Sequence, residues 1–79
     1  MNSSMIAQTI RSLLSRAPFE PFELITSAGE RHVVKHPEFA ILLPSRIVVT
    51  DPTADQLSII SLIHLTEART VSPSVRNGN

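Results

Sequence analysis

The chain has no cysteine, no tryptophan and no tyrosine, and its only aromatic residues are three phenylalanines among 79 residues. Without cysteine it can form neither a disulfide bridge nor a thiolate metal site, two devices that stabilise many small domains. The absence also fits a reducing compartment without requiring one. Because 42% of the residues are still apolar, the core must be aliphatic. A domain of this length is near the size at which one core becomes marginal, so it either packs economically or gains burial by self-association.

An excess of charge of one sign is missing as well. Seven basic and seven acidic residues cancel, and three histidines remain. Nucleic-acid-binding proteins usually carry a basic excess, because neutralising phosphates supplies much of their affinity, and the zero net charge therefore disfavours RNA binding. No apolar run reaches the length of a membrane span, and the first residues show no signal-peptide pattern. We expect a cytoplasmic protein that does not associate with membranes.

Residues 17–22, Ala-Pro-Phe-Glu-Pro-Phe, divide the sequence into two parts with different periodicity. Before this segment, four apolar residues recur at helical spacing: Ile6, Ile10, Leu13 and Leu14. That stripe predicts an amphipathic helix. Pro18 ends it, because proline disfavours helical geometry at the residue before it and lacks a backbone donor.

After this segment, short apolar runs alternate with turn residues at roughly ten-residue spacing, which is typical of an antiparallel meander. Strands are expected at residues 22–26, at 31–35 with a resumption at 39–43 after Pro37, at 47–50, at 57–60, and in a last element that ends near 71. The predicted fold is therefore mainly β, a small antiparallel five-stranded barrel with an N-terminal α-helix. Residues 1–71 form the single domain, and residues 72–79, which lack periodicity, form a flexible tail.

Two of the predicted strands do not alternate. Residues 41–43 (Ile-Leu-Leu) and 47–49 (Ile-Val-Val) are continuous apolar runs, whereas a half-exposed strand should alternate apolar and polar residues. Either the helix and a neighbouring strand cover both faces, or these edges meet another subunit. The shortness of the chain favours self-association through apolar strand edges.

The order of a helix, Pro-Phe-x-Pro-Phe, a hairpin and His-Pro-Glu-Phe resembles a group of small uncharacterised bacterial proteins. The matching residues are Pro18, Phe19, Pro21, Phe22, Gly29, His36, Pro37, Glu38 and Phe39, and the resemblance spans roughly residues 6–71 and implies no established activity. The order of elements is also similar in architecture to the Sm-like fold, a bent SH3-like barrel that commonly forms rings. The RNA-chaperone branch of that fold carries a Lys-His pair between its last two strands. Here Lys35-His36 follows the second predicted strand, so that role is not transferred.

No catalytic, cofactor or metal site is expected. His32 and His36 would lie roughly 13 Å apart on an extended strand, too far to share a metal ion. A triad of Ser61, His64 and Asp51 or Asp55 can be imagined, but such triads are defined by geometry and an oxyanion site, which sequence does not supply. The chain also has only two glycines, and no Gly-rich phosphate loop. We therefore expect a protein that is not an enzyme.

Two groups of residues remain as candidates for contacts. The candidate partner or RNA contacts are basic residues expected near one end of the barrel: Arg31, Lys35, His36 and Arg46. Their acidic neighbours Glu30 and Glu38 favour a solvated face with ion pairs over a phosphate-binding patch.

The candidate core anchors are the three aromatic residues: Phe19, Phe22 and Phe39. Two alternatives stay open for them. Residues 18–21 could instead be an extended segment presented to a partner, and Phe39 could stack on a base. The function predicted from the sequence is a non-enzymatic assembly or protein-interaction module of unknown pathway. The alternative is a ring-forming Sm-like RNA-binding protein.

Overall fold

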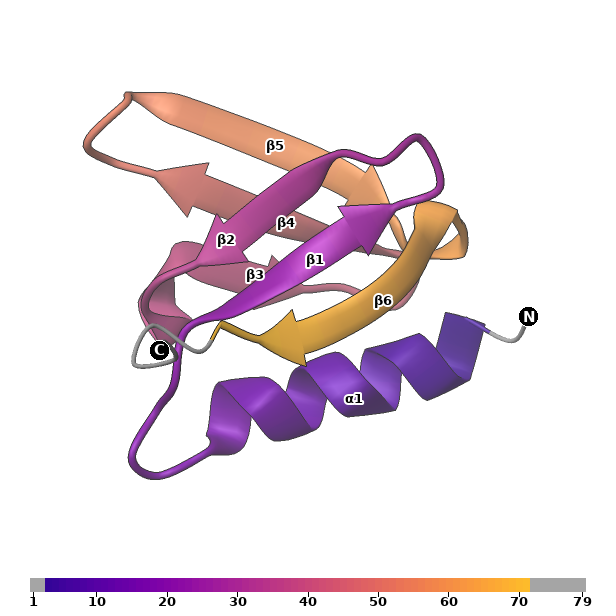
Figure 1. Cartoon of the computed structure of the whole chain (residues 1–79), viewed down its shortest axis with the longest axis horizontal. Helices are drawn as coiled ribbons and strands as arrows, with labels where there is room; N and C mark the ends of the chain where they lie inside the picture. The colour runs from indigo at the N-terminus through magenta and orange to yellow at the C-terminus, as the bar shows by residue number, and fades with distance from the viewer. Residues whose placement is uncertain (1–2, 72–79) are drawn as a thin grey trace, which may run out of the picture.

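The structure is a computed structural model that describes residues 3–71, with side chains from residue 5 onward. It is mainly β, with one N-terminal helix and six strands in two antiparallel sheets (Figure 1). The elements are α1 (Ser3–Ser15), β1 (Phe22–Thr26), β2 (Arg31–Val34), β3 (Ala40–Leu42), β4 (Arg46–Asp51), β5 (Gln56–Ser61) and β6 (Leu65–Thr70), with 3-10 turns η1 (Pro37–Phe39) and η2 (Leu62–His64). The tail predicted at residues 72–79 lies outside the described residues.

Two sheets of three strands replace the expected five-stranded barrel. Sheet A has the order β2-β1-β6 and sheet B the order β3-β4-β5, and the two do not close into one barrel. The sixth strand arises because Pro37 opens the turn η1, which divides the predicted second strand into β2 and β3. Proline cannot donate to a strand ladder, so pairing stops there. β2 consequently pairs in sheet A and β3 in sheet B.

The helix bridges the two sheets along one side. It ends at Ser15, before Pro18, and its inner stripe is centred on the fully buried Ile10. Four further apolar residues of α1 pack against the core: Ile6, Ala7, Leu13 and Leu14. α1 contacts β6 of sheet A, η2, and β3 of sheet B (Figure 1). A 13-residue helix is only marginally stable alone in water, and packing against the sheets stabilises α1. Within residues 3–71 no helix combines the length and apolar character needed to cross a bilayer.

The core lies between the sheets and is almost wholly aliphatic. Its buried apolar residues are Ile10, Phe22, Leu24, Val34, Ile47, Val49, Ile60, Leu62 and Leu65. Along β1 and β4 the buried positions alternate, so that one face of each central strand points inward.

Phe22 has no exposed surface. Phe19 packs against the same core. Its ring lies edge-to-face with the ring of Phe22, and the two ring centroids are 6.0 Å apart. Phe22 and, in part, Phe19 therefore belong to the core, whereas Pro18, Glu20 and Pro21 are exposed. Phe39 is partly buried, and its ring lies edge-to-face with His36 at 5.1 Å.

Candidate functional site

The outer face of sheet B carries a row of apolar side chains. On β4, Ile47 and Val49 point into the core, so Val48 points outward. The strand register places Val48 directly opposite Ile41 on β3 and Ile59 on β5. Ile41 is 57% exposed and Ile59 61%. We call Ile41, Val48 and Ile59 the apolar row.

Leu57 extends this row into a patch. It lies two residues from Ile59 on the same face of β5 and is also 61% exposed. The helix does not cover this patch, because α1 packs its apolar stripe against the core. The result is an apolar face that spans all three strands of sheet B.

The free edge of β5 adjoins this face. Within the described residues β5 pairs with β4 alone. The N–H of Leu62 donates to the C=O of Ser45 at 3.0 Å. This bond shows which residues of β5 direct their backbone N–H and C=O groups towards β4. In an antiparallel pair the hydrogen-bonding direction alternates along the strand. The N–H and C=O groups of Leu57, Ile59 and Ser61 therefore point away from β4.

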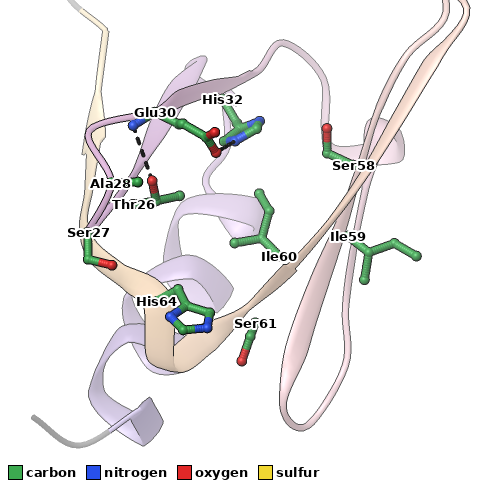
Figure 2. Close-up of a pocket in the computed structure, with 10 residues that line it drawn as sticks. All are labelled: Thr26, Ser27, Ala28, Glu30, His32, Ser58, Ile59, Ile60, Ser61 and His64. Carbon is green, nitrogen blue, oxygen red and sulfur yellow. Dashed lines mark hydrogen bonds and ion pairs between the residues drawn. The ribbon is translucent and has the colours of Figure 1, made fainter.

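An open cavity of about 480 Å³ lies between β5 and the hairpin that joins β1 and β2 (Figure 2). One of its walls is made by four consecutive residues of β5, Ser58 to Ser61, and another by the hairpin between β1 and β2, including Glu30 and His32. Side chains of consecutive strand residues point to opposite faces. Four in a row can line one cavity because the cavity borders the edge of the strand.

The composition of β5 is unusual for an edge. Its sequence, Gln-Leu-Ser-Ile-Ile-Ser, has no charged residue and no proline. Exposed edges are commonly protected by charges, prolines or shortness. In the other edge strands described, β2 carries Arg31, β3 has three residues between Pro37 and Pro44, and β6 carries Glu67 and Arg69. Only β5 among them lacks such protection.

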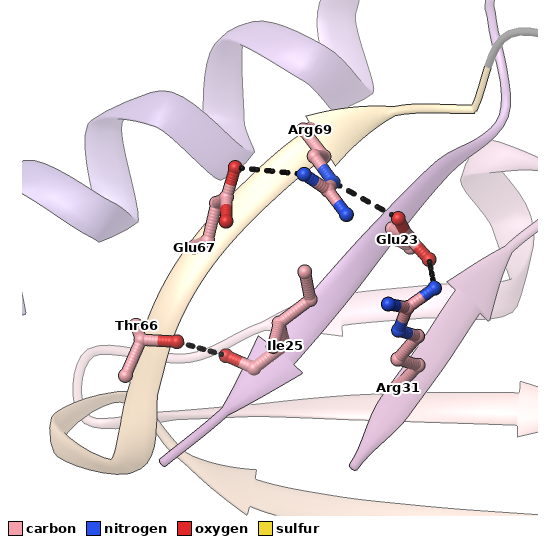
Figure 3. A network of polar contacts seen from close by, with 6 residues as sticks. All are labelled: Glu23, Ile25, Arg31, Thr66, Glu67 and Arg69. Atoms are coloured by element: carbon pink, nitrogen blue, oxygen red, sulfur yellow. Dashed lines mark hydrogen bonds and ion pairs between the residues drawn. The ribbon is translucent and has the colours of Figure 1, made fainter. Parts of the chain in front are cut away.

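Sheet A presents the opposite chemistry on its outer face (Figure 3). Glu23, whose side chain is 14% exposed, accepts a hydrogen bond from Nε of Arg69 at 3.0 Å and lies 4.0 Å from Nη1 of Arg31. A second carboxylate, that of Glu67, lies 3.5 Å from Nη1 of Arg69. The hydrogen bond with Glu23 and then the charge of Glu67 raise the pKa of Arg69 above its ordinary value. Ion pairs thus connect Arg31, Glu23, Arg69 and Glu67 across this face.

The cavity beside β5 also brings two histidines to one place. Nε2 of His32 is buried without a hydrogen-bond partner and lies 3.6 Å from Oε1 of Glu30. His64 borders the same cavity from η2, and its C=O accepts from the N–H of Ser27 at 2.8 Å. From the sequence, His32 was compared with His36 and His64 was placed with Ser61, and it was not foreseen that His32 and His64 border one cavity. Within residues 3–71 no three His, Asp or Glu side chains are grouped so that they could hold a metal ion.

The imagined catalytic triad is not assembled. Ser61 and His64 border one cavity. Asp51 pairs with Gln56 at the opposite end of β5, and Asp55 immediately precedes that strand.

The four basic residues singled out in the sequence are not all brought together. Lys35 and His36 border one small cavity, which Asp51 also lines, whereas Arg31 is paired with Glu23. Arg46 begins β4 and Asp51 ends it, so Arg46 lies about 17 Å from that cavity along the strand. The residues do not form one basic patch.

Asp51 reduces the positive potential beside Lys35. The hydroxyl of Thr53 donates to Oδ1 of Asp51 at 2.7 Å. This hydrogen bond, followed by the backbone N–H of Ala54 and the charge of Lys35, holds the pKa of Asp51 below its ordinary value. The carboxylate is therefore ionised next to the lysine at neutral pH.

No family model matches this chain, and neither a curated protein nor a solved structure matches it significantly. The most distinctive feature of the described residues is the uncovered apolar face of sheet B with the uncharged edge of β5 beside it.

Proposed function

We propose that this protein is a non-enzymatic assembly module that associates with further copies of itself through sheet B. The observation that carries this proposal is the apolar row, which crosses all three strands of the sheet while Ile41 and Ile59 are more than half exposed. Contiguous exposed apolar patches on small proteins mark interaction surfaces. A chain near the lower size limit for one core gains burial by covering such a patch.

Charge supports association between identical copies. The chain has zero formal net charge, so two copies do not repel one another over long distances. None of the four residues of the apolar face is charged, although Arg46 lies two residues from Val48 on the same side of β4. The cytoplasm is the compartment we assign to the module, in keeping with the absence of cysteine.

The finer architecture we propose is an opened Sm-like or SH3-like barrel. In this interpretation β2 and β3 are the two halves of one bent strand, interrupted at η1, and five strands result. The helix at the start and the 3-10 turn η2 before the last strand support this description.

Light scattering coupled to size-exclusion chromatography tests the assembly. We expect a mass of at least two chains at micromolar concentration, and a shift towards one chain when Ile41 and Ile59 are both changed to serine. Val33→Ser is the matched control, since Val33 is exposed on the outer face of sheet A. A wild-type mass of one chain across the micromolar range would contradict the proposal.

The ring-forming RNA-binding protein remains the alternative function. It predicts salt-sensitive binding of single-stranded RNA that is lost when Arg31, Lys35 and Arg46 are changed to alanine. The separation of Arg46 from Lys35, and the carboxylates beside Arg31 and Lys35, weigh against it. Fluorescence anisotropy with a labelled oligoribonucleotide at low salt decides, because absence of binding there would eliminate the alternative.

A further inference from the structure

We infer that β5 pairs antiparallel with the β5 strand of a second copy of this chain, about a two-fold axis at Ile59. The inference rests on the proposed self-association and specifies its geometry. It turns sheet B into a continuous sheet of six strands shared by two chains. Its premises are that β5 pairs with β4 on one side only among the described residues, that β5 has no charge or proline, and that the backbone groups of Leu57, Ile59 and Ser61 point away from β4.

The phase of the ladder with β4 determines which residues bond across the new interface. The outward-pointing backbone groups belong to Leu57, Ile59 and Ser61, as the bond from Leu62 to Ser45 shows. With Ile59 on the axis, Ile59 lies opposite its own copy, and Leu57 lies opposite Ser61 of the second copy. Each of these opposed pairs exchanges two N–H···O bonds. Every outward-pointing group of β5 then has a partner.

The same register joins the two apolar rows. Ile41, Val48 and Ile59 lie opposite one another within each sheet, so the row continues across the axis into the Ile59 of the second copy. Side chains directly opposite one another on a sheet contact each other, so apolar pairs there pack together, whereas like charges in that place destabilise the sheet. Since β5 carries no charge, the second effect is absent.

A register centred on Ser58 is poorer. It would place Leu57 opposite Ile59 of the second copy and leave Ser61 opposite Asp55. Asp55 lies in the turn between β4 and β5 with a φ of 54°, outside the strand. The backbone groups of Ser61 would therefore lose regular partners, which favours the register on Ile59.

Single cysteines test this register without background, because the natural chain has no cysteine. In the Ile59→Cys variant, the two cysteines lie opposite one another at a Cα separation of about 5.5 Å, within the range of a disulfide. In the Leu57→Cys variant, the two cysteines lie about 13 Å apart along the strands, beyond that range. Leu57 and Ile59 are equally exposed, so the second variant is a matched control.

We expect Ile59→Cys to form a covalent dimer under mild oxidation at least about tenfold faster than Leu57→Cys. A mixture of Leu57→Cys and Ser61→Cys should cross-link, although neither does so alone. Non-reducing electrophoresis measures the cross-link, and thermal unfolding of the reduced variants verifies that they fold. Equal rates for Ile59→Cys and Leu57→Cys would overturn the register.

Light scattering on the unmodified chain distinguishes self-association through sheet B from the specific pairing of two β5 strands. A dimer whose Ile59→Cys variant does not cross-link preferentially would overturn pairing through β5 while leaving self-association through sheet B intact. A monomer at all micromolar concentrations would overturn both, and would leave the β5 edge to an extended peptide of another protein.

Discussion

Sheet A and sheet B each have three antiparallel strands and share one core, yet the central parts of their outer faces differ in chemistry. Sheet A shows the network of Arg31, Glu23, Arg69 and Glu67, whereas sheet B shows an uncharged apolar row. The edge strands differ in charge as well. β2 contains Arg31 and β6 contains Glu67 and Arg69, whereas β5 contains no charged residue. The comparison supports the proposal that sheet B, and not sheet A, is the sheet that meets a partner.

The largest expected effect comes from Phe22, the largest fully buried side chain in the described residues. Phe22→Ala should destabilise the fold by about 3–5 kcal/mol, because the ring is fully buried and its removal leaves a cavity. Ile59→Ala, which removes an exposed side chain, should leave the stability of the isolated chain nearly unchanged. Chemical denaturation at low protein concentration measures both. A small effect of Phe22→Ala would mean that residues 17–22 serve docking and not the core.

Ile59→Lys is expected to have the next largest effect, on association. It places two like charges directly opposite each other at the inferred axis, and should weaken the dimer about tenfold or more, which corresponds to about 1.4 kcal/mol. Sedimentation equilibrium measures the change. Val33→Lys on sheet A is the control, and an equal loss of association in that variant would erase the distinction between the two faces.

Removing the central carboxylate of sheet A should have a smaller effect, on stability alone. Glu23→Gln weakens the contacts with Arg31 and Arg69 and should cost about 1 kcal/mol or less, since pairs near the surface are screened. Association through sheet B should be unchanged. If the variant instead aggregated or changed its oligomeric mass, sheet A would also belong to the interface.

The smallest expected effect concerns pH. The pKa of Asp51 is lowered in the folded chain, first by the hydroxyl of Thr53. Such a group contributes stability that is present above its unfolded pKa and is lost as pH falls through its folded pKa. Asp51→Asn should therefore be slightly less stable than the wild type at neutral pH, and the difference should vanish in acid. Thermal unfolding across this range tests the sign, and a difference that grows on acidification would contradict it.

Much of the local structure could be predicted from the chain alone. The stripe containing Ile10 and the position of Pro18 correctly predicted the helix and its end, and alternation and turn residues predicted most of the strands. The apolar runs 41–43 and 47–49 suggested either two covered faces or association through strand edges. The structure leaves Ile41 exposed on the outer side of sheet B, and association stays a prediction. Leu57 and Ile59 were not proposed from the sequence as interface residues. The absence of charged residues between positions 56 and 61 could have pointed to them.

The sequence by itself determined the helix, the approximate strand positions and an aliphatic core, because these follow from local periodicity and composition. Only the tertiary structure decided that Pro37 separates β2 from β3 into two sheets, that Ile41, Val48 and Ile59 lie side by side, and that His32 and His64 border one cavity. The physical reason is that strand pairing joins residues distant in sequence. Alternation tells which side chains share a face, but the register and the covering helix determine which face remains exposed.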